Sequence, residues 1–333
     1  MAHDFDVYAT ALAVGADGDP LQLFTEYAQR AESYGISGLL AFYNHGDLDP
    51  WVVAATILQH TKVMTPLIAL QPYTMTPFNA AKVIWSLTTL YRRRIDVNLI
   101  TGATKAELDE IGEQLDHDER FERATEYMRV VRALLSSNEP LVHEGRFYRY
   151  RSLRMYSRID PEFLPRVFVA GSSPAGQRMA AAVANVAITH PEPVEQFADG
   201  FLGQERQGQQ IGIRVGLVAR PTDEEAWSAA QAMYSEDRSA RLKTAMRKKS
   251  ESDWIRRLAH LATAEGVYDE VYWTGAFRAD KGNMPVLVGS YGKVADYLER
   301  YLDLGVSTVI LAGGFGEEDF EHASVVIGDL RRR

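Results

Sequence analysis

Residues 63–70, 77–90 and 95–100 read VMTPLIAL, PFNAAKVIWSLTTL and IDVNLI, and these three runs decide the fold. The first and third are short and apolar, which is typical of strands buried on both faces of a parallel sheet. The run between them begins with Pro and places apolar residues at helical spacing, which predicts an amphipathic helix. A strand, a helix and a second buried strand in direct succession form the repeating unit of parallel α/β proteins.

The same alternation continues in both directions along the chain. It predicts strands over residues 6–13, 38–42, 63–70, 95–100, 166–170, 186–189, 211–219 and 307–311. Helices are expected over residues 20–34, 50–60, 77–90, 118–136, 174–184, 193–207, 293–304 and 317–330, and one more begins at Thr222. Eight such units predict a (β/α)8 barrel with insertions. The alternative, a doubly wound sheet, usually carries G-x-G-x-x-G after a strand, and this sequence has no such run.

Two segments interrupt the repeat. Residues 140–165, rich in Tyr and Arg, are an excursion outside it. Residues from about 235 to 285 combine a basic helix with a Gly-containing loop, and we expect an insertion that acts as a mobile lid between strands seven and eight. Its basic residues either form a solvated helix face or hold an anionic ligand. No linker separates two halves, so a single domain over residues 1–333 is expected.

Composition excludes several classes of protein. The 333 residues contain no cysteine, which rules out disulfides, thiolate metal sites and a cysteine nucleophile. With 36 basic and 45 acidic residues, the net charge of −9 argues against a general nucleic-acid binder. No apolar run is long enough to span a membrane, and the N-terminus lacks the basic start of a secretory signal. We therefore expect a cytoplasmic protein. The charged cluster at residues 116–123 lacks a recognised metal-ligand spacing, so no metal site is expected.

Polar residues follow predicted strands four and five, where a barrel carries its chemistry. Asn98 lies inside an apolar strand and Thr101 at its end. After strand five, Gly171, Ser172 and Ser173 lead into a helix, whose free N–H groups suit a phosphate. The alternatives are an ordinary strand end for the first pair and simple helix N-capping for the serines.

The start of the helix predicted at 118–136 is unusually charged, reading DHDERFER from residue 116. Acidic residues in a first helical turn are favourable there, so a solvated helix opening explains most of them. His117 and Arg120 lie three residues apart and can share one helix face.

Taken in order, five segments resemble the luciferase-like flavin monooxygenases, and most closely their alkanesulfonate monooxygenase branch. The segments are VNLITG (97–102), DHDERFERATEYMRVVRALL (116–135), FVAGSSPAGQRMAA (168–181), IRVGLVARPTDEEAW (213–227) and LVGSYGKVADYLERYLDLGVSTVIL (287–311). The resemblance covers nearly the whole chain. It implies a (β/α)8 barrel that takes reduced FMN from a separate reductase and uses O2 to oxygenate a substrate. Some members use the deazaflavin F420 instead and transfer hydride.

The resemblance also implies roles for individual residues. It makes Thr101 a neighbour of the flavin ring, His117 a flavin contact, and Ser172 and Ser173, beside Gly171, phosphate ligands. Asn98 is a further candidate for binding the cofactor. Related members often carry Tyr where this chain has Phe121, so Arg120 is expected to compensate for the missing phosphate contact.

The departures from the sulfonate enzymes point to a different substrate. Arg214 matches one of their arginines, and Arg278 in GAFRADKG matches the arginine of their mobile loop. Gly216 stands where they carry a catalytic His, and we expect its small size to leave a deeper pocket. His45 is a candidate base that replaces the lost His; the alternative is a solvent-exposed loop residue. For Arg214 the alternative is an ion pair with Asp96.

These observations predict a two-component monooxygenase that uses reduced FMN and O2, with Arg214, Arg278 and His45 as catalytic candidates. The expected partners are a small organic substrate and an NAD(P)H:flavin reductase. A homodimer or homotetramer is expected as well. Two alternatives stay open, namely an F420-dependent oxidoreductase on the same fold and a non-catalytic flavin-binding relative.

Overall fold

The computed structural model describes residues 3–13, 19–102, 105–171, 173–201, 208–248, 252–313 and 316–333. Its helices are α1 (Pro20–Ser33), α2 (Pro50–His60), α3 (Pro77–Tyr91), α4 (Lys105–Glu110), α5 (His117–Ser136), α6 (Pro174–Val183), α7 (Val194–Gly200), α8 (Asp223–Met233), α9 (Arg238–Arg247), α10 (Asp253–Ala264), α11 (Gly275–Arg278), α12 (Tyr291–Asp303), α13 (Glu317–Arg332) and the 3-10 helix η1 (Pro161–Phe163). Its strands are β1 (Asp6–Thr10), β2 (Gly38–Ala41), β3 (Thr65–Leu70), β4 (Asp96–Leu99), β5 (Leu141–Glu144), β6 (Arg149–Leu153), β7 (Val167–Ala170), β8 (Val186–Thr189), β9 (Gln210–Arg220), β10 (Val267–Tyr268), β11 (Tyr272–Trp273), β12 (Val286–Ser290) and β13 (Val306–Leu311).

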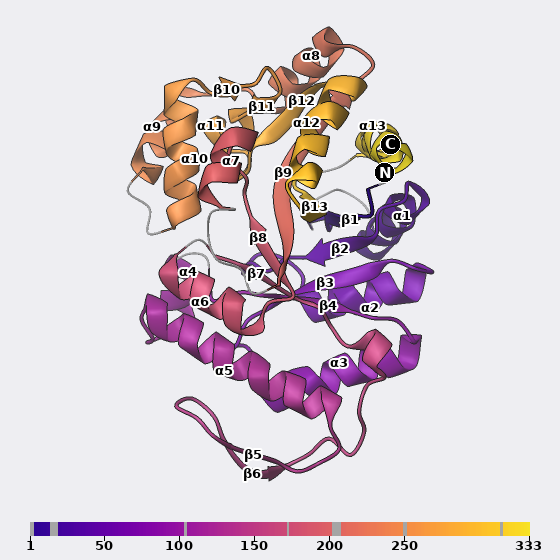
Figure 1. Cartoon of the computed structure of the whole chain (residues 1–333), viewed down its shortest axis with the longest axis vertical. Coiled ribbons are helices and arrows are strands. Elements are labelled where there is room, and N and C mark those ends of the chain that lie inside the picture. Colours follow the sequence, from indigo (N-terminus) through magenta and orange to yellow (C-terminus); the bar gives the residue numbers. More distant parts are fainter. Residues whose placement is uncertain are drawn as a thin grey trace. The chain divides into compact units, whose positions relative to one another are not determined.

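The predicted fold class is confirmed by the order of the strands. The hydrogen-bonded order runs β9-β13-β1-β2-β3-β4-β7-β8, and β9 also pairs with β8. Helices separate these strands along the chain, as the element order in Figure 1 shows. A closed order of eight strands with intervening helices is that of a (β/α)8 barrel.

The chain divides into two compact units, each described by itself below. Unit 1 comprises Met1–Leu12, Arg30–Ile36 and Ile188–Arg333, and unit 2 comprises Ala13–Gln29 and Ser37–Ala187. The prediction of a single domain over the whole chain stays a prediction.

The core of unit 2 follows directly from its sequence pattern. Along α5, buried residues recur at helical spacing: Ala124, Tyr127, Met128, Val131 and Leu135. A stripe with this spacing faces one side of a helix, and burying it stabilises the helix against its neighbours. Helices α3, α5 and α6 accordingly pack side by side, and the buried faces of β3, β4 and β7 join the same cluster.

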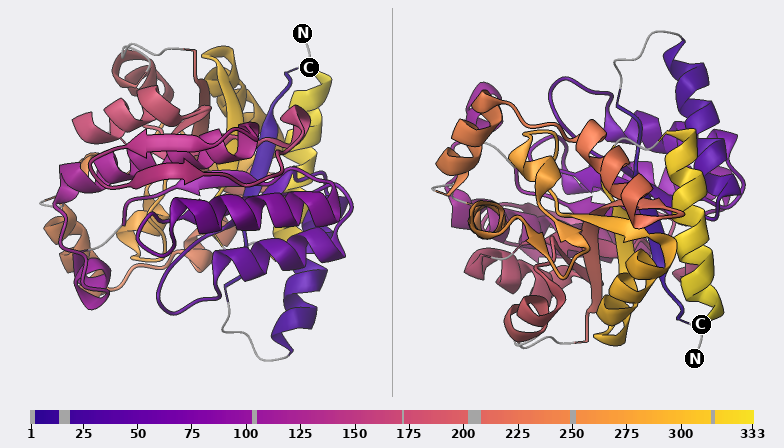
Figure 2. Two further views of the ribbon diagram at one scale, coloured as in Figure 1. Left: turned by 90° about the horizontal axis from the view of Figure 1, so that it is seen from below. Right: turned by 90° about the horizontal axis from the view of Figure 1, so that it is seen from above.

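Residues 140–165 form the antiparallel β5–β6 hairpin and η1, outside the strand–helix repeat as expected. Figures 1 and 2 show the hairpin on the outer side of α5. Leu141, Tyr148, Tyr150 and Leu153 pack against the unit 2 core. The hairpin is therefore held by apolar contacts although it lies outside the barrel.

Strand β12 of unit 1 was not predicted. The sequence pattern passes from the irregular segment to a helix at 293, but β12 lies between them and pairs in parallel with β9, Val286 opposite Gly216. Its run VLVGS is short and apolar, and it becomes a strand beside residues 216–220 of β9, which extend beyond the pairing of β9 with β13. The irregular segment itself contains α9, α10, β10, β11 and α11, and its mobility stays a prediction.

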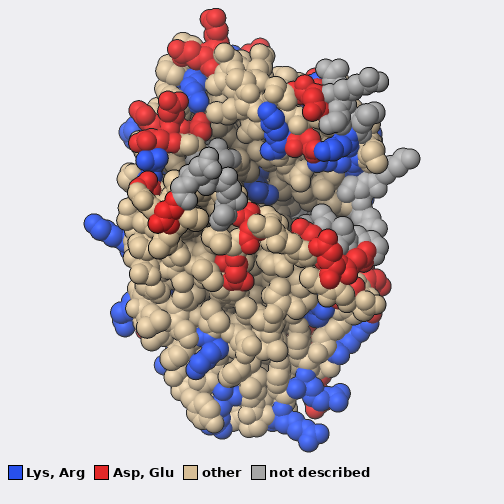
Figure 3. Space-filling view, turned by 180° about the vertical axis from the view of Figure 1, so that it is seen from behind, with Lys and Arg blue, Asp and Glu red and all other residues tan. Residues whose placement is uncertain are grey.

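No helix within the described ranges is long and apolar enough to cross a membrane. On the face drawn in Figure 3, acidic and basic side chains are interspersed, and basic ones are most frequent at the lower end. Figure 1 places the β5–β6 hairpin at that end, where Arg146, Arg149 and Arg151 are exposed.

Candidate active site

The carboxyl end of β4 carries a buried amide oxygen that no described residue satisfies. Asn98 lies on β4, and its Oδ1 has no hydrogen-bond partner within the described part of the chain. Thr101, three residues on, is also buried. Buried polar groups almost always have a partner, so an unpaired amide oxygen at this end of a barrel strand marks a place where a ligand can bind.

Arg120 ties the loop after β4 to the start of α5. Its Nε donates to the carbonyl of Thr101 at 3.1 Å, and its Nη1 donates to the carbonyl of Leu115 at 3.0 Å. The structure therefore brings the two predicted flavin residues Thr101 and Arg120 into contact. The guanidinium fixes the loop and places a positive charge beside Thr101.

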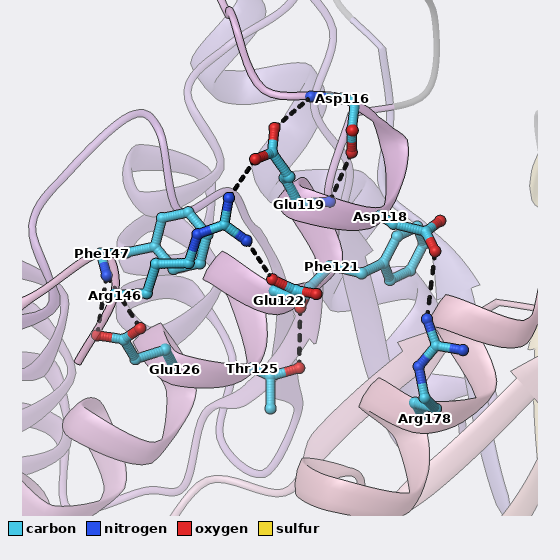
Figure 4. Close-up of polar contacts among 10 residues, drawn as sticks. All are labelled: Asp116, Asp118, Glu119, Phe121, Glu122, Thr125, Glu126, Arg146, Phe147 and Arg178. Atoms are coloured by element: carbon cyan, nitrogen blue, oxygen red, sulfur yellow. Dashed lines mark hydrogen bonds and ion pairs between the residues drawn. The ribbon is translucent and has the colours of Figure 1, made fainter.

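His117 is the first residue of α5, whose start carries a capping box. Asp116 Oδ1 accepts from the N–H of Glu119 at 2.8 Å, and Glu119 accepts from the N–H of Asp116 at 3.2 Å (Figure 4). The ring of His117 lies 4.9 Å from that of Phe121, and its Nδ1 lies 2.7 Å from Asp118 Oδ1.

Asp118 connects the starts of α5 and α6. Arg178 on α6 donates to Asp118 Oδ2 at 3.2 Å, as Figure 4 shows. The hydrogen bond from His117 holds the pKa of Asp118 below its ordinary value, and Arg178 lowers the pKa further. A phosphate near this helix start would therefore meet the carboxylate of Asp118 as well as the guanidinium of Arg178.

Ser173 is the N-cap of α6, as the simpler alternative proposed. Its hydroxyl oxygen accepts from the N–H of Gly176 at 3.1 Å. A Cβ on Gly171 would lie 2.9 Å from the Cα of Gly176, so Gly171 is required for close packing. Ser172 lies outside the described residues. The cap uses a lone pair of Ser173 and leaves its hydroxyl proton able to donate to an anion.

Unit 2 also contains a cavity of about 770 Å³ that the sequence analysis did not identify. It is lined by Tyr43, Pro72, Tyr73, Thr74, Ile111, Gly112, Glu113, Leu115, Arg123, Phe147 and Tyr148. These residues come from the loops after β2, β3 and β4, from α5 and from the hairpin turn. The available signal was the polar and aromatic run Gln71–Thr74 directly after a strand, in the position where barrels bind ligands.

The wall of this cavity contains a buried ion pair. Arg123 contacts Glu113, whose side chain is only 5% exposed. Burial alone raises the pKa of Glu113, but the hydrogen bond from Arg123 and one from the N–H of Leu115 outweigh it, so the pKa is lowered. Burial also raises the pKa of Tyr73 to about 12, so this phenol stays protonated at neutral pH and can donate a hydrogen bond.

One carboxylate of α5, that of Glu126, binds the turn of the hairpin, whose residues line the cavity. Glu126 accepts from the N–H groups of Phe147 and Tyr148, at 3.1 and 2.8 Å, and lies 3.0 Å from Nε2 of His143. Arg146 bridges the carboxylates of Glu119 and Glu122 (Figure 4). The segment that the sequence analysis placed outside the repeat thus returns to form part of the cavity wall.

His45 lies next to the cavity but does not line it. Its Nδ1 is 2.7 Å from Glu110 Oε2, and its ring meets that of Tyr43 edge to face with centroids 5.9 Å apart. A carboxylate on Nδ1 orients an imidazole, so Glu110 fixes the ring of His45 beside Tyr43.

The other catalytic candidates lie in unit 1. Arg214 is partly exposed, but its Nε is buried and lacks a partner in the described ranges. Asp96, the alternative partner named for Arg214, lies in unit 2 and pairs with Arg94 at 3.1 Å and with Arg166 at 2.9 Å. The Nε of Arg278 lies 2.7 Å from Glu236 Oε1.

The deeper pocket expected at Gly216 is wrong. A Cβ there would lie 3.0 Å from Val286 Cγ2 and 3.4 Å from the carbonyl oxygen of Ala312. The missing side chain is thus replaced by a residue of β12, a strand that was not predicted, and the space beside Gly216 is filled.

Comparison with known proteins supports the resemblance. The sequence profile of the family described as luciferase-like monooxygenase matches residues 4–308. A relative from Niallia circulans, named 4-(gamma-L-glutamylamino)butanoyl-(BtrI acyl-carrier protein) monooxygenase, is 43% identical over 302 residues, covering 90% of this chain and 88% of its own.

Solved structures share the fold at low sequence identity. The EDTA monooxygenase from Chelativorans sp. BNC1 has a TM-score of 0.76 at 17% identity, covering 99% of this chain and 94% of its own. A long-chain alkane monooxygenase has a TM-score of 0.75 at 17% identity, covering 100% and 92%. An F420-dependent secondary alcohol dehydrogenase has a TM-score of 0.65 at 16% identity, covering 98% and 99%.

Proposed function

Since the chain belongs to the luciferase-like monooxygenase family, we propose that it is a two-component monooxygenase that takes reduced FMN from a separate NAD(P)H:flavin reductase and oxygenates an acyl group tethered to a carrier protein. The observation that carries the proposal is the 43% identity, over 90% of the chain, to a monooxygenase whose name specifies such a substrate. The reductase and the carrier protein are the proposed partners, and we propose a homodimer or homotetramer in the cytoplasm.

The residues of unit 2 fit a flavin. The ring system of FMN carries amide-like donors and acceptors, which suit the unpaired amide oxygen of Asn98 and the buried Thr101. Its phosphate suits the start of α6, where Ser173 can donate, with Arg120 as a cationic partner and His117 as a further polar contact. Reduced FMN, when bound, supplies the two electrons with which one atom of O2 enters the substrate and the other is reduced to water.

The cavity in unit 2 supports a small organic substrate. Its volume of about 770 Å³ lies within the usual range of ligand pockets. Tyr43, Tyr73 and Phe147 provide aromatic walls, and the paired Glu113 and Arg123 leave little uncompensated charge. Such walls exclude water from the reacting groups and favour an apolar chain over an ion.

We assign His45 the task of accepting or returning a proton, because Glu110 orients its ring. Arg214 is proposed to bind a negative charge of the substrate. Arg278, held by Glu236 in this structure, is proposed to reach the substrate when the segment 235–285 closes as a lid. Limited proteolysis should cut this segment first near residues 241–257, and bound flavin or substrate should slow the cut.

The direct test is an anaerobic titration of the purified protein with FMN, reduced FMN and F420, followed by turnover with a flavin reductase, ¹⁸O₂ and a carrier-tethered acyl thioester. We expect tight binding of reduced FMN and incorporation of one labelled oxygen atom. Binding of F420 with hydride transfer would replace the proposal by the F420 alternative. Binding of neither cofactor would leave a non-catalytic relative.

A further inference from the structure

Unit 1 contains a second group of polar side chains, none of which lines the cavity of unit 2. We call it the His190 cluster; it comprises His190 and Glu192 after β8, Arg214 on β9, and Trp254 and Arg257 on α10. Charge interactions link Arg214 and Arg257 to His190, and Arg257 to Glu192. The carboxyl end of a barrel strand, where His190 lies, is the side on which this fold binds its ligands.

The cluster is short of hydrogen-bond partners on both donors and acceptors. Within the described residues, His190 Nε2, Glu192 Oε2, Arg214 Nε, and both Nε and Nη2 of Arg257 are buried and unpaired. Each unsatisfied buried group costs about 1–3 kcal/mol, and more when charged. A folded protein keeps several such groups together only where something else satisfies them.

Tyrosine hydroxyls and ring stacking hold the backbone and the imidazole of the cluster in place. His190 stacks on Trp254 with ring centroids 4.0 Å apart and planes 11° apart. The hydroxyl of Tyr301 donates to the carbonyl of Glu192 at 2.5 Å, and that of Tyr272 donates to the carbonyl of Pro191 at 3.0 Å. Side chains held in this way are prepared for a ligand and lose little freedom when it binds.

The charges define the class of ligand. Arg257 Nη1 and Glu192 Oε1 form an ion pair at 2.6 Å, which uses one nitrogen of the guanidinium and one oxygen of the carboxylate. Burial, together with Arg214 and Arg257, lowers the pKa of His190, so this imidazole is neutral. Arg257 therefore stands beside both Glu192 and His190, and Arg214 stands beside His190. Within the described residues, both guanidinium groups keep a buried N–H without a partner and Glu192 keeps an unpaired oxygen. A simple anion would pair with the guanidinium groups but leave the carboxylate oxygen of Glu192 without a partner.

We propose that the His190 cluster binds a zwitterionic α-amino-acid group, with its carboxylate at Arg214 and Arg257 and its ammonium at Glu192. The inference rests on the proposed function only in taking this group to be part of the acyl substrate. It makes Arg214 and Glu192 determinants of substrate specificity.

The test measures binding by calorimetry without flavin or carrier protein. The probes are the γ-butylamide of L-glutamic acid, the mono-butylamide of glutaric acid, which lacks the ammonium, and the butylamide of γ-aminobutyric acid, which lacks the carboxylate. We expect the first probe to bind at least about tenfold more tightly than either analogue, since each analogue leaves a buried charged group unpaired.

Variants assign the two ends of the ligand. Glu192→Gln should abolish the preference for the probe with an ammonium, and Arg214→Lys should weaken both carboxylate probes at least about tenfold, because Lys lacks the planar fork. Arg300→Gln, an exposed arginine of α12 that lies 4.0 Å from Asp269, is the matched control and should change nothing. If Glu192→Gln does not fold by circular dichroism, Glu192→Asp keeps the charge and should reduce the preference.

The outcomes separate the inference from the proposed function. Equal affinity for the three probes, or no binding of any of them by a protein that still binds reduced FMN, would overturn the inference and leave ordered water in the cluster. The expected pattern of binding in a protein that never oxygenates a tethered acyl group would uphold the inference and overturn the proposed function.

Discussion

Replacing Ser173 separates the two tasks that this residue can perform at the start of α6. Its hydroxyl caps the helix by accepting from the N–H of Gly176 at 3.1 Å, and we propose that it also donates to the phosphate of FMN. Ser173→Ala removes both interactions. Ser173→Asp keeps the cap, because Asp is as good an N-cap as Ser, but places a carboxylate against the phosphate.

The expected magnitudes differ for the two variants. Loss of an N-cap costs roughly 1 kcal/mol of stability, which only Ser173→Ala should show. A lost hydrogen bond to a charged group is worth about 1.5–3 kcal/mol, so FMN affinity should fall at least about tenfold in Ser173→Ala. One pair of like charges about 5 Å apart at an effective dielectric constant of about 20 costs about 3 kcal/mol, so Ser173→Asp should lose at least about a hundredfold.

The measurements are urea unfolding for stability and flavin fluorescence titration for affinity. Thr76→Ala is the matched control, because Thr76 caps α3 in the same way, accepting from the N–H of Asn79 at 3.3 Å. It should lower stability like Ser173→Ala and leave FMN affinity unchanged. If Ser173→Asp binds FMN as tightly as the unmodified protein, α6 does not hold the phosphate and Ser173 is only a cap.

Three further substitutions test the walls of the site. Arg123→Met should lower the unfolding free energy by about 3–5 kcal/mol at pH 7, because it leaves Glu113 buried without its partner. The pKa of Glu113 is lower in the folded than in the unfolded protein. The stability that its ion pair contributes is therefore present above the unfolded pKa and is lost as the pH falls through the folded pKa. Urea unfolding at several pH values should show the stabilities of the variant and the unmodified protein converging in acid. Gly171→Ala should cost at least about 1–3 kcal/mol in the same assay, because its Cβ would lie 2.9 Å from the Cα of Gly176, and equal stability would contradict the close packing. Glu126→Ala should release the hairpin turn, so its amides should exchange hydrogen at least about tenfold faster, and unchanged protection would mean that apolar contacts alone hold the turn.

Local sequence signals determined most of the elements of this protein. The helix predicted over 50–60 is α2 with the same bounds, because Asp49 caps it and Pro50 suits its first turn. The strand predicted over 186–189 is β8, a short apolar run between polar residues. These features depend on residues a few positions apart, so the sequence determines them without reference to tertiary contacts. The same holds for the helix starts that place His117 and Ser173.

Only the tertiary structure decided which side chains meet. The sequence singled out Arg120, but its contact with the carbonyl of Thr101 depends on α5 folding back beside β4. It suggested an open pocket at Gly216, and Val286, seventy positions further along the chain, fills that space. It gave no sign that His190 would stack on Trp254.

The physical reason is that composition and periodicity report the faces of single elements, whereas partners are set by how distant elements pack. Within the described residues, Asn98 Oδ1 and Glu192 Oε2 are buried without a partner, which is known only after distant elements have packed. The sequence could therefore determine the barrel and nominate residues at the ends of its strands. The cavity lined by Tyr73, and the buried polar atoms without a partner in the described part of the chain, depend on how distant elements pack.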